Sequence, residues 1–400
     1  MSAMFATAFN AIRGMVSDPS PIIGPTQQAT LDAAGAEQAQ FQPTYFSEQV
    51  FETSLQFPQS AGGNVYIMRL QGTNKRFVRK HTRKTSRIDY DGQPGSLPNE
   101  AKILQDHVQP HPCIVSLLAS FQDHEDPTRW NLWMPYYNGG ALSSQYAYWQ
   151  VKHHMPMPEP FLLHTIIQSV EALAFLHHGV RYAGDGRYTR DVSHHAIIHG
   201  DIKGEQFVLV HGENILLDHD GREHIGDMPN LVLLDFGTSR LESDTSACVE
   251  IGTVAYGSPE DLAIHQGFNR GAAHVSELVQ RYVRAIANRT LAHDIYSLGL
   301  LLSQYASQRR EPHEVGFDVA QLAVLEEYET PGLADLLRKM LAVKPEERAV
   351  AHLDAERGIL PSIHELRKAR DQMIAAREPI DSAQWATMPN KLRKKLAGTE

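Results

Sequence analysis

Two aspartates and one lysine carry the clearest chemistry in this sequence. Asp201 and Lys203 lie in the stretch His-Gly-Asp-Ile-Lys, which apolar runs flank on both sides, and Asp235 follows another apolar run, Leu-Val-Leu-Leu. Short apolar runs of this kind predict buried strands, so we expect both carboxylates and the ammonium at neighbouring strand ends. A carboxylate together with phosphate oxygens suits Mg²⁺, and a second carboxylate can accept the proton of an attacking hydroxyl. The sequence therefore predicts a site for phosphate and magnesium.

The elements that would position this site change in character along the chain. Between Val65 and Lys80, two β-rich runs flank a Gln-Gly-Thr-Asn turn, which predicts a hairpin. A helical pattern follows at 99–108, and apolar runs at 114–121 and 131–137 predict further strands. Segments that are apolar nearly all round, as in buried helices, follow at 160–178, 294–305 and 333–341. A strand-rich first part and a helix-rich second part indicate an α+β protein with two lobes.

The stretch His-Gly-Asp-Ile-Lys and the later Asp-Phe-Gly resemble the catalytic loop and the metal motif of eukaryotic-type protein kinases. The resemblance implies the two-lobed protein-kinase fold, with a small antiparallel sheet and one helix in the N-lobe and a larger, mostly helical C-lobe. It also implies ATP and Mg²⁺ as cofactors, Asp201 as the catalytic base and Lys203 beside the transferred phosphoryl group. Asp235 would then bind magnesium, and Gln206 would stand where the family has an amide ligand.

A nucleotide site follows from the same resemblance. Lys80 resembles the lysine that anchors the phosphates, and Glu100 resembles the helix glutamate that pairs with it. The stretch Trp-Asn-Leu-Trp-Met-Pro-Tyr-Tyr resembles the hinge, with Met134 as gatekeeper; without the family, it is only a buried aromatic strand and a turn. The residues implied to contact the nucleotide are Gly63, Val65, Lys80, Glu100, Met134, Tyr136 and Tyr137.

Three later residues resemble structural supports of the family. Asp294 resembles the buried aspartate that holds the backbone of the catalytic loop. Arg348 resembles the late arginine that pairs with the glutamate closing the activation segment, here Glu260 in Gly-Thr-Val-Ala-Tyr-Gly-Ser-Pro-Glu. Because buried charges need partners, we expect each of them to be paired.

The sequence departs from the family pattern in the phosphate loop and the catalytic loop. Pro58 and Ser60 replace two glycines, which limits close approach of the backbone to phosphate. Gln206 is one methylene longer than the usual asparagine, so a bound Mg²⁺ would have to shift or lose that ligand. Asn214, in an insertion between the two motifs, is an alternative ligand. Gly200 replaces the arginine that reads a phosphate on the activation segment, which argues against that form of control.

Composition divides the chain into three predicted parts. These are an N-terminal extension at 1–44, with a short helical pattern and a linker; a kinase-like domain at 45–355, with its N-lobe at 45–135 and its C-lobe at 136–355; and a charged tail at 356–400. Alternating charges in the tail indicate a solvated helix. The insertion at 268–290 and the tail are candidates for partner contact, and covering of the helical lobe is the alternative for the insertion.

Charge and cysteine content exclude several classes of protein. The net charge of -10 would repel nucleic-acid phosphates, so we expect no nucleic acid partner. The 2 cysteines cannot form a disulfide framework, which favours a reducing location, cytoplasmic or nuclear. No apolar run is long enough for a transmembrane segment. The opening segment has one amphipathic helical pattern, and a targeting role for it stays open beside a packed or frayed helix.

Three functions are compatible with these residues. The retained lysines and carboxylates favour an active kinase that transfers the γ-phosphoryl group of ATP to protein Ser or Thr. The departures favour a pseudokinase, a nucleotide- or partner-binding module of kinase shape. The His-Gly-Asp triplet also occurs in small-molecule phosphotransferases, which lack a peptide-docking element such as 252–260. The protein substrate is not identified by the sequence.

Overall fold

The computed structural model describes rather more than half of the chain. The described residues are 46, 50–57, 64–83, 97–123, 126, 129–147, 149, 157–210, 228–245, 252–262, 286–306, 328, 330–353 and 356–376. Several predictions fall outside them: the extension at 1–44, the phosphate-loop residues Pro58, Ser60 and Gly63, the alternative ligand Asn214, most of the insertion at 268–290, and the last part of the tail.

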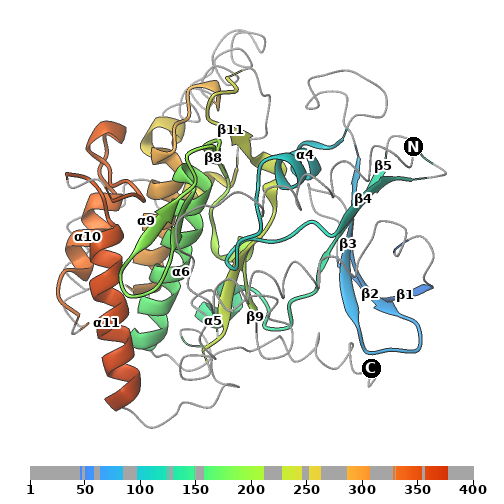
Figure 1. The fold of residues 1–400 in the computed structure, drawn as a ribbon, viewed down its shortest axis with the longest axis horizontal. Helices are drawn as coiled ribbons and strands as arrows, with labels where there is room; N and C mark the ends of the chain where they lie inside the picture. Colours follow the sequence, from blue (N-terminus) through green and yellow to red (C-terminus); the bar gives the residue numbers. More distant parts are fainter. Residues whose placement is uncertain are drawn as a thin grey trace.

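A five-stranded antiparallel sheet forms the first lobe (Figure 1). Its order is β1 (Phe51–Gln56), β2 (Asn64–Leu70), β3 (Arg76–Arg83), β5 (Arg129–Pro135) and β4 (Ala119–Gln122). Strands β2 and β3 form the predicted hairpin, in which Val65 lies opposite Lys80. Gly72 in the connecting turn has a φ of 76°, a left-handed conformation that glycine adopts without strain. Helix α4 (Asn99–Asp106) belongs to the same lobe.

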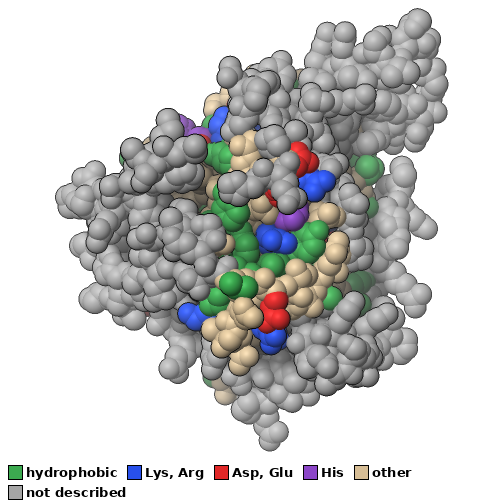
Figure 2. Space-filling model, turned by 90° about the vertical axis from the view of Figure 1, so that its right-hand side faces the viewer, with side chains coloured by type: hydrophobic (Ala, Val, Ile, Leu, Met, Phe, Trp, Pro, Cys, Tyr) green, Lys and Arg blue, Asp and Glu red, His purple; other side chains and the backbone are tan. Residues whose placement is uncertain are grey.

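Aromatic side chains cover the outer face of this sheet. Phe46 packs on Phe51, Phe77 and Trp133, with ring centroids 4.8 Å to 5.9 Å apart. Figure 2 views the molecule from the right-hand side of Figure 1 and shows hydrophobic and basic side chains next to one another at the centre of that face. These aromatic residues belong to a second, smaller core, while Leu132 and Met134 of β5 are part of the main core. The sheet can therefore present Lys80 on a rigid strand.

Helices form the second lobe around α6 (Glu159–His178), which is buried along almost its whole length. The others are α5 (Leu142–Ala147), α9 (Ala292–Ala306), α10 (Leu333–Met340) and α11 (Leu360–Ala376). Buried all round, α6 and α9 fulfil the prediction of core helices, and the two-lobed α+β architecture is confirmed. The same prediction is wrong for α10, because its charged residues Asp335, Arg338 and Lys339 form an exposed face. None of the described helices is both long enough and apolar enough to cross a membrane.

Helix α11 corrects one prediction. The alternating charges of the tail predicted a solvated helix, but α11 packs along α6 and buries one face (Figure 1). Arg367 pairs with the buried Glu171, and Arg370 lies 2.9 Å from a ring nitrogen of His164. The solvated helix is therefore wrong for residues 360–376, because two arginines find buried partners on another helix.

Three short two-stranded ladders fix the loops of the second lobe. They are β6 (Val180–Tyr182) with β7 (Tyr188–Arg190), β8 (Ile197–Ile198) with β11 (Arg240–Leu241), and β9 (Phe207–Val210) with β10 (Asn230–Leu233). The loop that carries Asp201 runs from β8 to β9, and Asp235 follows β10. Pairing of β9 with β10 therefore brings the two predicted carboxylates to the same end of one ladder.

Candidate active site

Lys80 lies at the centre of a three-residue ion cluster between the lobes. Its Nζ is 2.7 Å from Glu100 Oε2 on α4 and 2.7 Å from Asp235 Oδ1 after β10. The side chains of Lys80 and Glu100 are only 8% and 4% exposed, whereas that of Asp235 is 38% exposed. Three residues remote in sequence therefore meet in one cluster, and the Asp235 carboxylate remains partly exposed.

Lys80 and Asp235 hold each other in the ionised state, whereas burial raises the pKa of Glu100 above its ordinary value despite Lys80. Burial alone would lower the pKa of Lys80, but Glu100 and Asp235 raise it above its ordinary value. Burial alone would raise the pKa of Asp235, but Lys80 outweighs burial and lowers it to about 2. Asp235 is thus a carboxylate near neutral pH, as a magnesium ligand must be.

The backbone around Asp235 is held in an uncommon conformation. Asp235 has a φ of 60°, and its side chain accepts a hydrogen bond from the Gly237 N–H. Asn99, which precedes Glu100, donates its side-chain amide to the carbonyls of Ser239 and Gly237, at 2.7 Å and 3.4 Å. Helix α4 is therefore attached to the metal motif by two neighbouring residues, Asn99 and Glu100.

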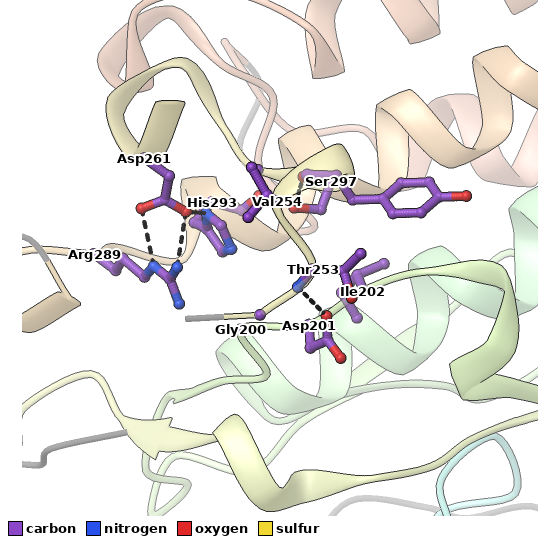
Figure 3. Close-up of a pocket in the computed structure, with 12 residues that line it drawn as sticks. Gly200, Asp201, Ile202, Thr253, Val254, Asp261, Arg289, His293 and Ser297 are labelled. Carbon is purple, nitrogen blue, oxygen red and sulfur yellow. Dashed lines mark hydrogen bonds and ion pairs between the residues drawn. The ribbon is translucent and has the colours of Figure 1, made fainter. Parts of the chain in front are cut away.

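Asp201 accepts hydrogen bonds on both carboxylate oxygens. The backbone N–H of Thr253 donates to Oδ1 at 2.6 Å (Figure 3). Lys203 Nζ donates to Oδ2 at 2.7 Å. Lys203 also donates to the Thr253 hydroxyl at 2.6 Å. Burial favours the neutral acid, but Lys203 and the other donors lower the pKa of Asp201 below its ordinary value. Asp201 can therefore accept a proton.

Asp294 fixes the backbone of the catalytic loop, as the resemblance implied. Its carboxylate accepts the backbone N–H groups of His199 at 2.7 Å and Gly200 at 2.9 Å. His177 Nε2 lies 3.0 Å from the same carboxylate, and both side chains are fully buried. Because a carboxylate with several donors is a strong acceptor, this contact holds the loop in one conformation.

Gln206 lies between the carboxylates of Asp201 and Asp235. Its Nε2 is 3.0 Å from Asp201 Oδ2 and 3.4 Å from Asp235 Oδ2. The Asp235 carboxylate suits Mg²⁺ and would hold it together with phosphate oxygens. Gln206 would join them only with its amide oxygen turned toward the ion, because its nitrogen now faces both carboxylates. Among the described residues, no group of three or more His, Cys, Asp or Glu side chains is placed to bind a metal.

The predicted hinge residues lie at the end of β5 and directly after it. Met134 is buried and pairs with Val78 across β3 and β5, at the inner end of the cleft. Tyr136 and Tyr137 continue from the strand, and burial raises the pKa of both phenols. Val65, on β2 opposite Lys80, lies on the same sheet. With Lys80 and Glu100, six of the seven residues predicted to contact the nucleotide are therefore described, while Gly63 lies outside the described residues.

The end of the activation segment is anchored by a buried ion pair. Arg348 donates from both Nη atoms to the Glu260 carboxylate, at 2.8 Å and 3.0 Å, and to nearby backbone carbonyls. Burial favours neutral Glu260, but Arg348 lowers its pKa below the ordinary value. The predicted Glu260–Arg348 pair is present in the structure.

Thr253, Gly252 and Asn99 are site residues that the sequence did not single out. Gly252 allows the activation segment to approach the catalytic loop, since a Cβ there would lie 2.1 Å from the Gly200 carbonyl oxygen. The stretch Gly-Thr-Val-Ala-Tyr-Gly-Ser-Pro-Glu was the available signal for Gly252 and Thr253. Nothing comparable marked Asn99, because its partners are backbone carbonyls.

Comparison with known proteins agrees with this geometry. A family model described as the protein kinase domain matches residues 59–353, which is well over half of the chain. A search of curated proteins found no match. The family match covers strands β2 to β5 of the sheet, α4, the catalytic loop, the metal motif and the Glu260–Arg348 pair, and leaves out β1. The chain belongs to the protein kinase family.

Proposed function

We propose that this protein kinase is catalytically active and transfers the γ-phosphoryl group of ATP to Ser or Thr of a protein. One observation carries the proposal: Lys80, Glu100 and Asp235 meet at a single cluster, and Gln206 links Asp235 to Asp201 within 3.4 Å. Phosphoryl transfer needs mainly positioning and charge stabilisation, and this cluster supplies both.

Each side chain has a chemical role in the proposed reaction. Lys80 would bind nucleotide phosphates and Asp201 would accept the proton of the acceptor hydroxyl. Lys203 would offset the negative charge of the transferred group. Mg²⁺, held by Asp235 and Gln206, would neutralise phosphate charge when bound.

A protein acceptor is supported by the segment 252–260. Its start contacts Asp201 through Thr253, and its end is fixed by Arg348, so it lies beside the proposed base. Such a segment gives a peptide a surface next to the reacting hydroxyl, which a small-molecule acceptor would not need. The resemblance links Lys203 to Ser and Thr as acceptors.

The pseudokinase alternative rests on Gln206. Its amide donates toward both carboxylates, so the metal would have to compete with Asp201 for this side chain. A binding module predicts partner or nucleotide binding that persists when Asp201 is neutralised.

Asp201→Asn decides between these functions. The variant keeps the size of the side chain but removes the proton acceptor, so we expect peptide phosphorylation with ATP and Mg²⁺ or Mn²⁺ to fall by a factor of about 10³. Binding of ATP should be unchanged, and a thermal shift with nucleotide and metal would report it. Equal turnover by the two proteins, or none by the unmodified protein, would reject the active-kinase proposal.

A further inference from the structure

Arg240 is a fully buried cation whose partners are all backbone carbonyls. It lies on β11, five residues after Asp235, and is 1% exposed. Nη1 donates to the carbonyls of residues 241, 242 and 244, and Nη2 to those of 286, 287 and 289, at 2.6 Å to 3.2 Å. Six acceptors use every N–H of both Nη atoms, so these donors are committed within the chain.

The six carbonyls belong to two separate segments. One is the turn after β11, where the activation segment begins, and the other precedes α9, the helix that carries Asp294. Carbonyls at a turn or helix end carry partial negative charge, which a guanidinium stabilises. Arg240 therefore ties the beginning of the activation segment to the element that holds the catalytic loop.

Arg289 makes a second link from the same place. Its Nε and Nη2 lie 3.1 Å and 2.9 Å from the two oxygens of Asp261, which follows Glu260 (Figure 3). His293 Nδ1 is 2.9 Å from the same carboxylate. The side chains of Arg289 and Asp261 are 2% and 4% exposed, so the pair lies in a poorly screened environment.

Arg289 also lies against the catalytic loop. Its Nη1 is 3.5 Å from the position that a Cβ would occupy at Gly200, whose φ of 81° suits glycine. Arg289, Gly200, Asp201 and Thr253 line one small cavity. The guanidinium thus fills space beside Gly200 and faces the contact between Thr253 and Asp201.

We propose that Arg240 and Arg289 are positioning residues that hold residues 252–254 against Asp201 without phosphorylation of the activation segment. In this arrangement the Asp261 carboxylate takes the place of the phosphate that a regulated activation segment would acquire. The carboxylate is always present because it is part of the chain. Both Nη atoms of Arg240, and Nε and Nη2 of Arg289, are already paired. Among the described residues, Arg240 Nε and Arg289 Nη1 have no hydrogen-bond partner, but both atoms are buried, so a phosphate has little access to them. The inference deepens the proposed function by assigning its regulation: the kinase is constitutively assembled.

Hydrogen exchange of the activation segment tests the proposal without relying on activity. Phosphatase-treated full-length protein is compared with Arg240→Met, Arg289→Met and the control Arg338→Met, which alters an exposed arginine of α10. We expect protected amides at 252–257 in the treated protein and in the control. In Arg240→Met and Arg289→Met these amides should exchange at least about tenfold faster. Peptides from β2, β3 and β5 should not change.

Kinetics supply a second readout. In both variants kcat for a peptide substrate should fall about tenfold or more, while KM for ATP stays within about twofold, because the Lys80 cluster is separate. If the amides of a Met variant exchange faster throughout the protein, the Arg→Lys variant at that position is measured instead and the same results are expected. Lysine keeps the positive charge but lacks the planar guanidinium group.

Two results overturn the proposal: unprotected amides at 252–257 in the phosphatase-treated protein, or unchanged exchange there when Arg240 is replaced. Protected amides in a protein that transfers no phosphate would reject the proposed activity and leave this inference standing.

Discussion

The two lysines of the site have similar partners but different surroundings. Lys80 lies between two carboxylates from different lobes, and its side chain and that of Glu100 are almost fully buried. Lys203 contacts Asp201 and Thr253, with 20% of its side chain and 10% of the Asp201 side chain exposed. Charge pairs weaken with solvent exposure, so Lys80 should matter for folding and Lys203 mainly for the reaction.

Replacing Lys80 should have the largest effect on stability. Lys80→Met leaves the carboxylates of Glu100 and Asp235 facing each other, one of them buried, without a cation. Breaking a buried pair in this way costs about 3–5 kcal/mol. We expect the free energy of unfolding, measured in urea, to fall by this amount.

A double variant sharpens this result. Lys80→Met combined with Glu100→Gln removes one of the two unpaired charges and should recover part of the loss. If Lys80→Met were as stable as the unmodified protein, the cluster would not hold the lobes together.

Replacing Lys203 should lower stability less than replacing Lys80 does, and its main effect should be a loss of activity. In Lys203→Met, Asp201 keeps the Thr253 N–H and the Gln206 amide, so we expect a loss of about 1–2 kcal/mol. Peptide phosphorylation should fall by a factor of about 10² because the charge facing the phosphoryl group is lost. Steady-state kinetics and urea unfolding on one preparation measure both. A loss of stability equal to that of Lys80→Met would remove the proposed difference between the lysines.

The pH dependence tests which carboxylates are paired. Because the folded-state pKa of Asp235 is about 2, below its ordinary value, the charge–charge stabilisation is complete above about pH 4 and is lost as pH falls toward 2. Asp235→Asn should therefore have a flatter stability profile between pH 4 and pH 2 than the unmodified protein. Urea unfolding across this interval measures it, with Asp335→Asn as an exposed control. Parallel profiles would mean that Asp235 is not paired with Lys80.

The sequence predicted those parts of the site whose chemistry lies in the side-chain type. The roles of Lys80, Asp201 and Asp235 each require a side chain of a particular charge. The motifs that contain these residues follow one another in a fixed order along the chain. The hairpin and the buried helices were predictable for a similar reason, since their periodicity is a property of side chains.

Contacts to the backbone were not predictable in this way. Asn99 and Arg240 bind carbonyls, which every residue has, so nothing in the partner sequences marks them. The burial of α11 was missed because Arg367 and Arg370 read as surface charges, although Glu171 and His164 lie far away in sequence. A charged residue is buried or exposed according to partners that only the fold brings near.

The smallest effect belongs to the exposed pair of Arg338 and Asp335 on α10. Their side chains are 46% and 73% exposed, although the contact at 2.6 Å is as short as those of Lys80. Water screens the pair and competes for both groups, and ordering two long side chains costs entropy, so Arg338→Gln should change stability by less than about 0.5 kcal/mol. Urea unfolding in low and high salt measures this. A loss comparable to that of Lys80→Met would show that distance, rather than burial, sets the strength of these pairs.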